Sequence, residues 1–376
     1  MSPAGRGVTL PGRYYVDPSI FAKEQAQIFS REWVYVARAA GVPDAGDVVR
    51  RNVAGESILV VRGRDDVLRA FLNVCRHRGS QLCLVNTANV RNTIRCPYHS
   101  WSYGLDGGLL AAPNWEWMSD EEKSGFSLDE VALETWNGLI WVNLADDPTG
   151  LADHLDPQLD YRFGGDAIRI GKYGLDELVV GASKTYEVEA NWKIIQENFQ
   201  ECYHCSTIHP ELIEQIPVFA SPDALGTDGY FTDGYRFAES RPGFSLSGRA
   251  ALPTLPGLGS DELGKYFGMV LRPNCFVSLL PDHAIVHRFE AVSASSSRVV
   301  CDWLFAADVA AAPDFDPIDS VEIFHRVNLQ DFAAAQWCQP NMASRAYREG
   351  GCLVPTEAEI IGNWYYPWYR ERIGES

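Results

Sequence analysis

Short apolar runs separated by turn residues occupy the chain from about residue 45 to residue 145. Two of them, ESILVVRG and VLRAFLNVC, are separated by the turn Arg64-Asp65-Asp66, and TIRC, SWSYGLDGG and NGLIWVNL follow. Runs of this length, rich in β-branched and aromatic residues and bounded by Gly, Asp or Asn, are typical of strands. We therefore predict an antiparallel β domain from about residue 45 to residue 145.

The hydrophobic period becomes helical at Asn191, beyond a segment rich in Asp, Pro and Gly, ADDPTGLADHLDPQLD, which we interpret as a linker. Within NWKIIQENFQECYHCSTIHPEL an apolar helical face is formed by Trp192, Ile195, Phe199 and Cys202. A second, polar face is formed by Glu197, Glu201 and His204. A further long helix is predicted from about Ser320 to Tyr347, so the predicted fold class is α+β.

Composition narrows the classes of protein to consider. A length of 376 residues favours two domains, each able to bury a full core. The formal net charge of -18 argues against nucleic acid as a partner, because a phosphate backbone is bound by clustered Lys and Arg. Nine irregularly spaced cysteines, without an apolar secretory segment at the N-terminus, indicate a reducing compartment. The apolar runs are too short to cross a bilayer, so we expect a soluble cytoplasmic protein with no membrane partner.

Two short segments combine cysteine with histidine. Cys75 and His77 lie in CRHRG, and Cys96 and His99 lie in CPYH. Two thiolates and two imidazoles suit either a tetrahedral zinc ion or a [2Fe-2S] cluster with both histidines on one iron. Common zinc patterns pair Cys with Cys and His with His, whereas each segment here supplies one residue of each type. This arrangement favours the iron-sulfur cluster but leaves zinc open.

A second group of metal-binding residues follows the predicted helix. His204 and His209 are too far apart in sequence for one helical face, but Pro210 disfavours the helical conformation at residue 209 and allows the chain to turn. Such a turn would bring the two imidazoles together. Two histidines and one carboxylate form an iron site with open positions, so the site requires a carboxylate from elsewhere in the chain.

Asp331 is the best candidate for that carboxylate. It lies on a helical stripe whose other members are apolar or small: Phe324, Val327, Ala335 and Cys338. Burying a carboxylate without a partner would cost on the order of several kcal/mol. The partner of Asp331 is then either a metal ion or an arginine, and the residues alone leave both open.

The two cysteine-histidine segments also carry a family resemblance. Cys75-x-His77-Arg78-Gly79 with Cys96-Pro-Tyr-His99-x-Trp101 closely resembles the cluster-binding loops of Rieske proteins. Together with the helical histidine segment, they make the chain resemble the α subunits of Rieske non-haem iron oxygenases over nearly its whole length. The resemblance implies a Rieske [2Fe-2S] domain over residues 41–155. It would be inserted between residues 1–40 and 156–376 of a helix-grip catalytic domain with an antiparallel sheet.

The same resemblance implies roles for individual residues. The cluster ligands would be Cys75, His77, Cys96 and His99, and the ligands of the mononuclear iron would be His204, His209 and Asp331. Glu201 would be an electron relay, hydrogen-bonded to His204 and to His99 of a neighbouring subunit in a head-to-tail homotrimer. A separate flavin and [2Fe-2S] reductase would supply electrons from NAD(P)H, since the chain has no convincing G-x-G-x-x-G after a strand.

Within that family, NWK, ECYHC and HPEL are most similar to the branch that oxidises quaternary ammonium compounds: glycine betaine, proline betaine and carnitine. This similarity implies a monooxygenase that uses O2 to remove an N-methyl group. Gln336 departs from the glutamate usual in that branch, which leaves the substrate open. The alternatives are an oxygenase of aromatic or alicyclic carboxylic acids, a Rieske electron carrier, and a zinc-stabilised binding module.

The residues that bind the substrate are unknown from the sequence. Aromatic side chains could form a cage for a cation, because the face of each ring attracts positive charge. The candidates between the two iron-ligand segments are Tyr230, Phe231, Tyr235 and Phe237. Core packing is the alternative role for each of them.

Overall fold

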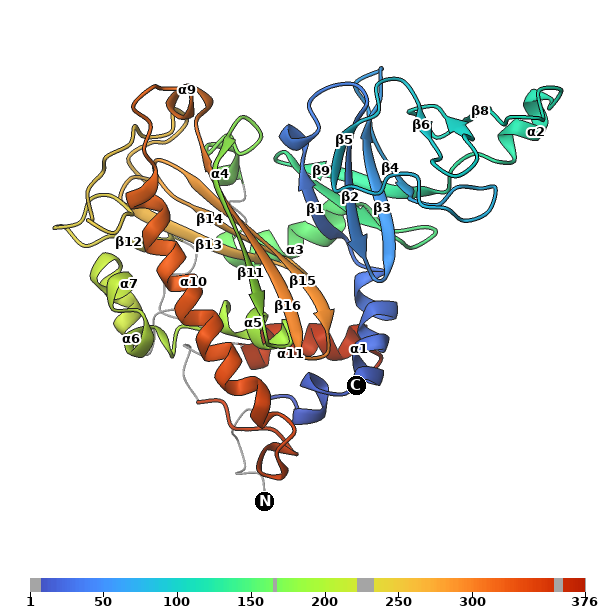
Figure 1. Ribbon diagram of the computed structural model, residues 1–376. Coiled ribbons are helices and arrows are strands. Elements are labelled where there is room, and N and C mark those ends of the chain that lie inside the picture. Colours follow the sequence, from blue (N-terminus) through green and yellow to red (C-terminus); the bar gives the residue numbers. More distant parts are fainter. Residues whose placement is uncertain (1–7, 165–167, 222–232, 355–360, 376) are drawn as a thin grey trace. The chain divides into compact units, whose positions relative to one another are not determined.

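The structure, a computed structural model, describes residues 8–164, 168–221, 233–354 and 361–375 of the chain. Its helices and strands fall into two folded units (Figure 1). The β unit comprises Gln25–His154, and the mixed unit combines Met1–Glu24 with Leu155–Ser376.

An antiparallel sheet of seven strands forms the β unit, in the order β1-β10-β9-β4-β3-β2-β5. Its strands are β1 (Val34–Arg38), β2 (Asp47–Val53), β3 (Glu56–Arg62), β4 (Leu68–Leu72), β5 (Thr87–Asn89), β9 (Glu130–Trp136) and β10 (Leu139–Asn143). A smaller sheet contains β6 (Ile94–Arg95), β7 (Ser102–Tyr103) and β8 (Leu109–Ala111), and the short helix α2 (Asp120–Ser124) follows. The β9–β10 hairpin turns at Asn137 and Gly138, whose φ values of 46° and 74° are those of a type I′ turn.

The N-terminal boundary of the β unit differs from the one predicted at residue 40. Strand β1 pairs with β10, so this segment belongs to the β unit. All five β1 residues are buried. Pairing with β10 satisfies their backbone groups, and packing removes the apolar side chains of this strand from water.

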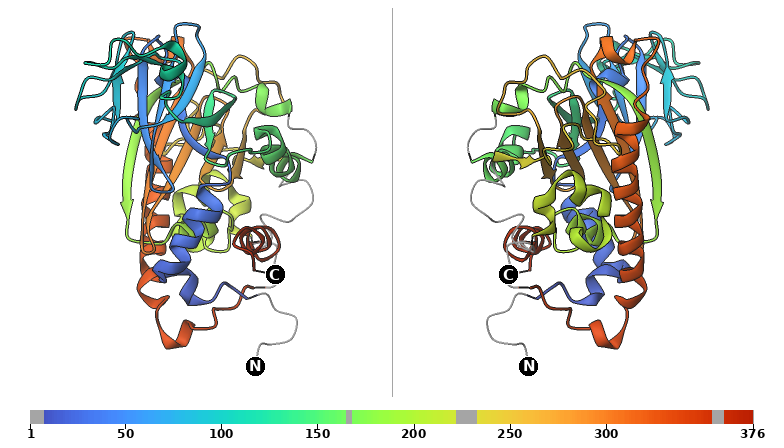
Figure 2. Two further views of the ribbon diagram at one scale, coloured as in Figure 1. Left: turned by 90° about the vertical axis from the view of Figure 1, so that its right-hand side faces the viewer. Right: turned by 90° about the vertical axis from the view of Figure 1, so that its left-hand side faces the viewer.

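A six-stranded antiparallel sheet is the centre of the mixed unit, in the order β11-β16-β15-β14-β13-β12. Its strands are β11 (Val179–Val188), β12 (Tyr235–Arg236), β13 (Lys265–Leu271), β14 (Cys275–Leu279), β15 (Ala284–Ser293) and β16 (Ser296–Phe305). Helix α10 (Ile318–Cys338) runs along one face of this sheet (Figures 1 and 2). Its Phe332 ring lies 5.0 Å from that of Tyr186 on β11, and Phe324 lies 5.4 Å from His287 on β15. The α+β class with an antiparallel sheet against a helix is therefore as predicted.

The remaining helices of the mixed unit are shorter. They are α1 (Pro18–Glu24), α3 (Leu151–Phe163), α4 (Ile168–Gly171), α5 (Trp192–Asn198), α6 (Cys205–Ile208), α7 (Pro210–Gln215), α9 (Ala307–Ala310) and α11 (Ile361–Arg372). Two predicted elements were wrong in extent. The linker is helical from Leu151 onward as α3, and the helix predicted to reach Tyr347 ends at Cys338, shortly before Pro340.

A buried ion pair anchors the start of α5, the helix that leads into the histidine segment. Lys193 Nζ donates to Glu24 Oε1 at 2.6 Å, and the indole of Trp192 donates to Glu24 Oε2 at 2.8 Å. Glu24 and Lys193 are both fully buried. Because removing one partner of such a pair leaves an uncompensated buried charge, α5 is firmly fixed to α1. Within the described residues, no helix has the length and apolar character needed to span a bilayer.

Candidate metal centres

The two cysteine-histidine loops of the β unit have the same backbone design. The backbone carbonyl oxygen of Cys75 accepts a hydrogen bond from Gly79 N at 3.0 Å, and that of Cys96 accepts one from Ser100 N at 3.1 Å. Gly79 and Ser100 both have positive φ, 72° and 64°. Each loop is therefore a tight turn that closes four residues after its cysteine, and the glycine of CRHRG is there for its backbone conformation.

The cysteine and histidine side chains of these loops differ in their exposure to solvent. The thiols of Cys75 and Cys96 are buried in the apolar core of the β unit, whereas the His77 side chain is exposed. The imidazole rings of His77 and His99 lie 4.6 Å apart, and His99 Nδ1 is buried with no hydrogen-bond partner among the described residues. Two buried sulfurs with two imidazoles nearer the surface fit the donor set of a Rieske cluster.

Tyr103 supports the first loop from β7. Its hydroxyl lies 3.3 Å from Cys75 Sγ and accepts a hydrogen bond from Arg76 N at 3.1 Å. Burial raises the pKa of the Cys75 thiol. Burial also acts on Cys96, but there the backbone N–H groups of Tyr98 and His99 outweigh it and lower the pKa. Such N–H groups favour the thiolate, the form that binds iron.

In the mixed unit the chain leaves the helical path earlier than predicted. Helix α5 ends at Asn198, and Phe199 is its C-cap residue. Glu201 and His204 therefore do not share a helical face, and lie instead in the turn between α5 and α6. The predicted turn at Pro210 is confirmed: Pro210 begins α7, and His209 has the non-helical angles φ -117° and ψ 65°.

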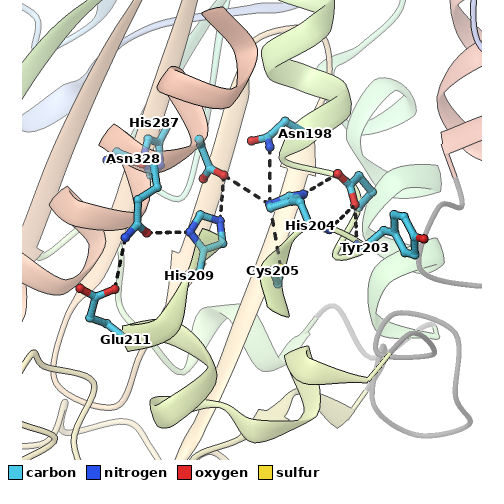
Figure 3. A network of polar contacts seen from close by, with 11 residues as sticks. Asn198, Tyr203, His204, Cys205, His209, Glu211, His287 and Asn328 are labelled. Atoms are coloured by element: carbon cyan, nitrogen blue, oxygen red, sulfur yellow. Dashed lines mark hydrogen bonds and ion pairs between the residues drawn. The ribbon is translucent and has the colours of Figure 1, made fainter. Parts of the chain in front are cut away.

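This path brings His204 and His209 close together (Figure 3), and Asp331 contacts both of them. His204 Nε2 lies 3.3 Å from Asp331 Oδ1, and His209 Nε2 lies 2.9 Å from the same oxygen. Neighbouring ligands of a six-coordinate ion, at bonds of about 2.1 Å, lie roughly 3 Å apart. The arrangement therefore fits a two-histidine, one-carboxylate metal site. In the described part of the chain, the ion-pair partners of Asp331 are these two imidazoles, and not the arginine of the alternative hypothesis.

Each imidazole is oriented by a second side chain. Glu201 Oε1 hydrogen-bonds His204 Nδ1, and Gln330 Oε1 lies 2.8 Å from His209 Nδ1. An acceptor at Nδ1 holds the proton there, which leaves the Nε2 lone pair free for a metal ion. Glu211 accepts from Gln330 Nε2 at 3.2 Å and so fixes which end of that amide faces His209.

Sequence reasoning missed Gln330 and Glu211. Only their closeness in sequence to the predicted ligands could have indicated them: Gln330 directly precedes Asp331, and Glu211 lies two residues after His209 in HPEL. Cys205 was also not predicted as a neighbour of this site, yet its sulfur lies 3.9 Å from His204 Nε2. Cys205, His204 and His209 place one ligand atom each within 4.8 Å of one another.

The electrostatics of the site favour a bound positive charge. Burial disfavours the charged imidazole of His204, but hydrogen bonds with Asp331, Cys205 and Glu201 raise its pKa well above the ordinary value. Burial would raise the pKa of Asp331, but hydrogen bonds from His204 and His209 lower it. The carboxylates thus stabilise a cation between them, either a proton or a metal ion.

A cavity of about 130 Å³ opens beside these residues. His204, His209 and Asp331 line one part of it. The described residues that supply its aromatic lining are Tyr161, Phe199, Phe219, Tyr235, Tyr266, Phe276, Phe324 and Trp364. Tyr235 was one of the predicted cage candidates, whereas Phe237 lines a different cavity and Tyr230 and Phe231 lie outside the described residues.

Gln336 is not among the described residues that line this cavity. Its Oε1 accepts a hydrogen bond from Glu189 N at 3.1 Å, which ties α10 to the end of β11. The departure from the branch pattern at residue 336 therefore acts on packing and does not touch the cavity.

Two family models and several known proteins match the chain. Residues 32–119 match the Rieske [2Fe-2S] domain, and residues 175–375 match the ring hydroxylating alpha subunit (catalytic domain). The chain is 30% identical to the glycine betaine monooxygenase oxygenase subunit of Chromohalobacter salexigens, covering 97% of this chain and 86% of that protein. It is 39% identical to the carnitine monooxygenase oxygenase subunit of Escherichia coli over 56% of this chain and 54% of that one.

A solved structure is also similar. It is that of a quaternary ammonium Rieske monooxygenase, described with insights into carnitine oxidation and inter-subunit electron transfer. The TM-score is 0.75 at 25% identity, and the match covers 98% of this chain and 96% of that one.

Proposed function

Because the chain belongs to the ring-hydroxylating alpha subunits of the Rieske oxygenases, we propose that it removes an N-methyl group from a small quaternary ammonium compound such as glycine betaine, proline betaine or carnitine. It is an oxidoreductase that uses a Rieske [2Fe-2S] cluster, a mononuclear iron and O2. The observation that carries the proposal is a small aromatic-lined cavity with three convergent iron-ligand candidates in its wall.

The proposed iron ligands are His204 and His209 through Nε2 and Asp331 through its carboxylate. The proposed cluster ligands are Cys75, His77, Cys96 and His99. When bound, the iron supplies O2 activation at positions that three protein ligands leave open. Glu201 and Gln330 each lie at Nδ1 of one imidazole, so each Nε2 is the nitrogen that is presented to the metal ion, which displaces any proton there.

Electron delivery involves a second copy of the chain in this proposal. Glu201 is the relay between His204 of one subunit and His99 of the next in a head-to-tail homotrimer. Two surface features support the proposal: Tyr203, whose backbone N–H donates to Glu201 Oε2, has a side chain that is about half exposed, and His77 lies at the surface of the β unit. A separate reductase supplies the electrons, since both named relatives are oxygenase subunits. The free cysteines suit the reducing cytoplasm as the compartment.

The reaction balances as a monooxygenation. One atom of O2 enters a C–H bond of an N-methyl group, and the other leaves as water with two electrons and two protons from the reductase and solvent. The hydroxymethyl ammonium product then loses formaldehyde and a proton to leave a tertiary amine. The faces of Phe199, Phe276 and Phe324 attract the ammonium group, each by roughly 0.5–2 kcal/mol.

Turnover tests the proposal directly. The iron-loaded protein, O2 and a surrogate reductase are incubated with glycine betaine, proline betaine, carnitine, choline and benzoate, and formaldehyde and product mass are followed. We expect formaldehyde from an ammonium compound together with a product lighter by one methylene. Hydroxylated benzoate without formaldehyde would instead support the aromatic-acid alternative. A cluster that cycles while none of the five compounds turns over would refute the quaternary ammonium proposal.

A further inference from the structure

A cysteine lies between the two histidines of the proposed iron site. Cys205 directly follows His204 and begins α6, and His209 comes one helical turn later. The backbone N–H of His209 donates to the carbonyl oxygen of Cys205 at 3.1 Å, which is the helical hydrogen bond across that turn. Residues four positions apart across such a turn are neighbours, so the Cys205 thiol and the His209 imidazole lie on the same side of α6.

The thiol approaches the nitrogen that faces the proposed metal position (Figure 3). Its sulfur is 3.9 Å from His204 Nε2, and the same nitrogen is 3.3 Å from Asp331 Oδ1. Asn198 also approaches this nitrogen, but its Nδ2, at 3.5 Å, is a hydrogen-bond donor and has no lone pair for a metal ion. The thiol therefore adds a metal donor to those of the imidazoles and the carboxylate.

The sulfur belongs to the same buried space as the other donors. Cys205 is 3% exposed, and it lines the cavity together with His204, His209 and Asp331. Single ligand atoms of Cys205, His204 and His209 lie within 4.8 Å of one another. A metal ion bound to the imidazoles from the cavity side therefore has this sulfur beside it.

A sulfur donor changes which metal the site suits. Two imidazoles and a carboxylate leave positions open, as Fe(II) needs for O2 chemistry, whereas a thiolate in the set favours zinc. Bonds of about 2.3 Å to sulfur and about 2.0 Å to nitrogen, at a tetrahedral angle, put the two ligand atoms roughly 3.5 Å apart. The distance from Cys205 Sγ to His204 Nε2 is only a few tenths of an ångström longer, so a small movement of the thiol completes such a site.

From this arrangement we propose that Cys205 is a further metal donor at the mononuclear site, and that with it the site binds Zn²⁺ in place of iron. Zinc displaces the thiol proton and is bound by two imidazoles, the thiolate and the Asp331 carboxylate. Four ligands complete its coordination, and zinc has no redox chemistry, so it inhibits the protein by competing with iron. This inference rests on the proposed function for the metal position, which the two ions share, and not for the substrate.

X-ray absorption at the zinc edge tests the proposal in the wild-type protein. A chelator removes the mononuclear iron anaerobically, the visible spectrum verifies that the cluster is intact, and one equivalent of Zn²⁺ is added. The cluster contains no zinc, so only the added ion is observed. We expect one sulfur at about 2.3 Å, with nitrogen and oxygen atoms at about 2.0–2.1 Å.

Two other results of that measurement would overturn the inference. A shell of nitrogen and oxygen alone would show that the Cys205 thiol does not bind the ion. Two sulfurs would place zinc at Cys75 and Cys96, the proposed cluster ligands.

The second test changes the cysteine. Chelator competition should give Cys205→Ser a zinc dissociation constant at least about tenfold higher than that of the wild type, the lower end of the losses seen for groups that only orient a ligand. Its Fe(II) dissociation constant should stay within about threefold, because the three iron ligands remain. The matched control is Cys202→Ser: Cys202 is 7% exposed, lines the same cavity, and should keep the wild-type constants for both ions.

The ratio of zinc affinity to iron affinity separates a ligand from a structural role. Equal losses for both ions in Cys205→Ser, or no loss for zinc, would overturn the inference. Turnover of an ammonium compound by a protein whose bound zinc has no sulfur ligand would overturn this inference alone. A zinc-sulfur bond in a protein that releases formaldehyde from no ammonium compound would support this inference and overturn the proposed function.

Discussion

Gln330 is the residue whose replacement tests the metal site most sharply. Its Oε1 is the acceptor for His209 Nδ1 at 2.8 Å, and His209 is 1% exposed, so water cannot replace the lost amide. In Gln330→Leu the Nδ1–H of the metal-binding tautomer would be buried without an acceptor. Such a group costs about 1–3 kcal/mol, which corresponds to a roughly 5- to 150-fold weaker affinity for iron.

The same substitution stabilises the metal-free site. Without the amide, the proton of His209 is free to move to Nε2, where Asp331 Oδ1 is an acceptor 2.9 Å away. Iron must then displace this proton, which adds to the loss of affinity. The loss expected from both effects agrees with the 10- to 100-fold typical of groups that orient metal ligands.

Anaerobic competition for Fe(II) against a chelator measures the affinity of each variant for iron. The visible spectrum of the cluster gives the concentration of folded protein. The double variant Gln330→Glu with Glu211→Gln keeps an acceptor at Nδ1 and a donor between the two side chains, and should bind iron nearly as the wild type does. Leu329→Ala, at a half-exposed position on the same helix, controls for disturbance of α10. An iron dissociation constant for Gln330→Leu within twofold of the wild type would refute the assignment of Gln330 as the group that orients His209.

Three further predictions concern the two metal centres, and a fourth concerns the buried Glu197. Glu201→Gln should keep both centres but slow single-turnover oxidation of the cluster, and a wild-type rate would remove Glu201 from the relay. Asp331→Ala should lose the mononuclear iron, measured by metal analysis, while the visible spectrum of the cluster is unchanged; retained iron would disprove its role as a ligand. Tyr103→Phe removes the hydroxyl 3.3 Å from Cys75 Sγ, so potentiometry should show a lower reduction potential, and an unchanged potential would count against that contact. Burial raises the pKa of Glu197 from 4.5 to about 8, so the contribution of this group to stability is present below pH 4.5 and is lost as the pH rises through 8. The Tm of Glu197→Gln should therefore fall less between pH 6 and pH 9 than the Tm of the wild type. Parallel Tm curves for the two proteins would contradict this prediction.

The cluster loops were the most predictable part of the chain. Cys75 with His77 and Cys96 with His99 are close in sequence, so their donor types and spacing restrict the chemistry before any packing is known. The turn at Pro210 was predictable for the same reason, because proline restricts the residue that precedes it wherever the two occur. Asp331 could be predicted as buried from its apolar neighbours on the helix.

The extents of helices were less predictable. The segment from Asn191 to His204 keeps a helical period, yet α5 ends at Asn198. The Glu201 carboxylate accepts hydrogen bonds from the backbone N–H groups of Tyr203 and His204. These bonds compete with those of a continued helix, and the hydrophobic period of the sequence does not reveal them. At the other end of the mixed unit, Pro340 and the 3-10 turn around it end α10.

The sequence by itself determined which donor groups this protein offers to metals and which helical face buries Asp331, because both follow from residue type and local spacing. Only the tertiary structure decided that Gln330 meets His209 across 121 positions of sequence, that Gln336 contacts the end of β11, and that Arg162 lines the same cavity as His204 and Asp331. Periodicity identifies the buried side of an element but not what packs against it. That depends on contacts between distant segments, which form only when the sheet and α10 come together.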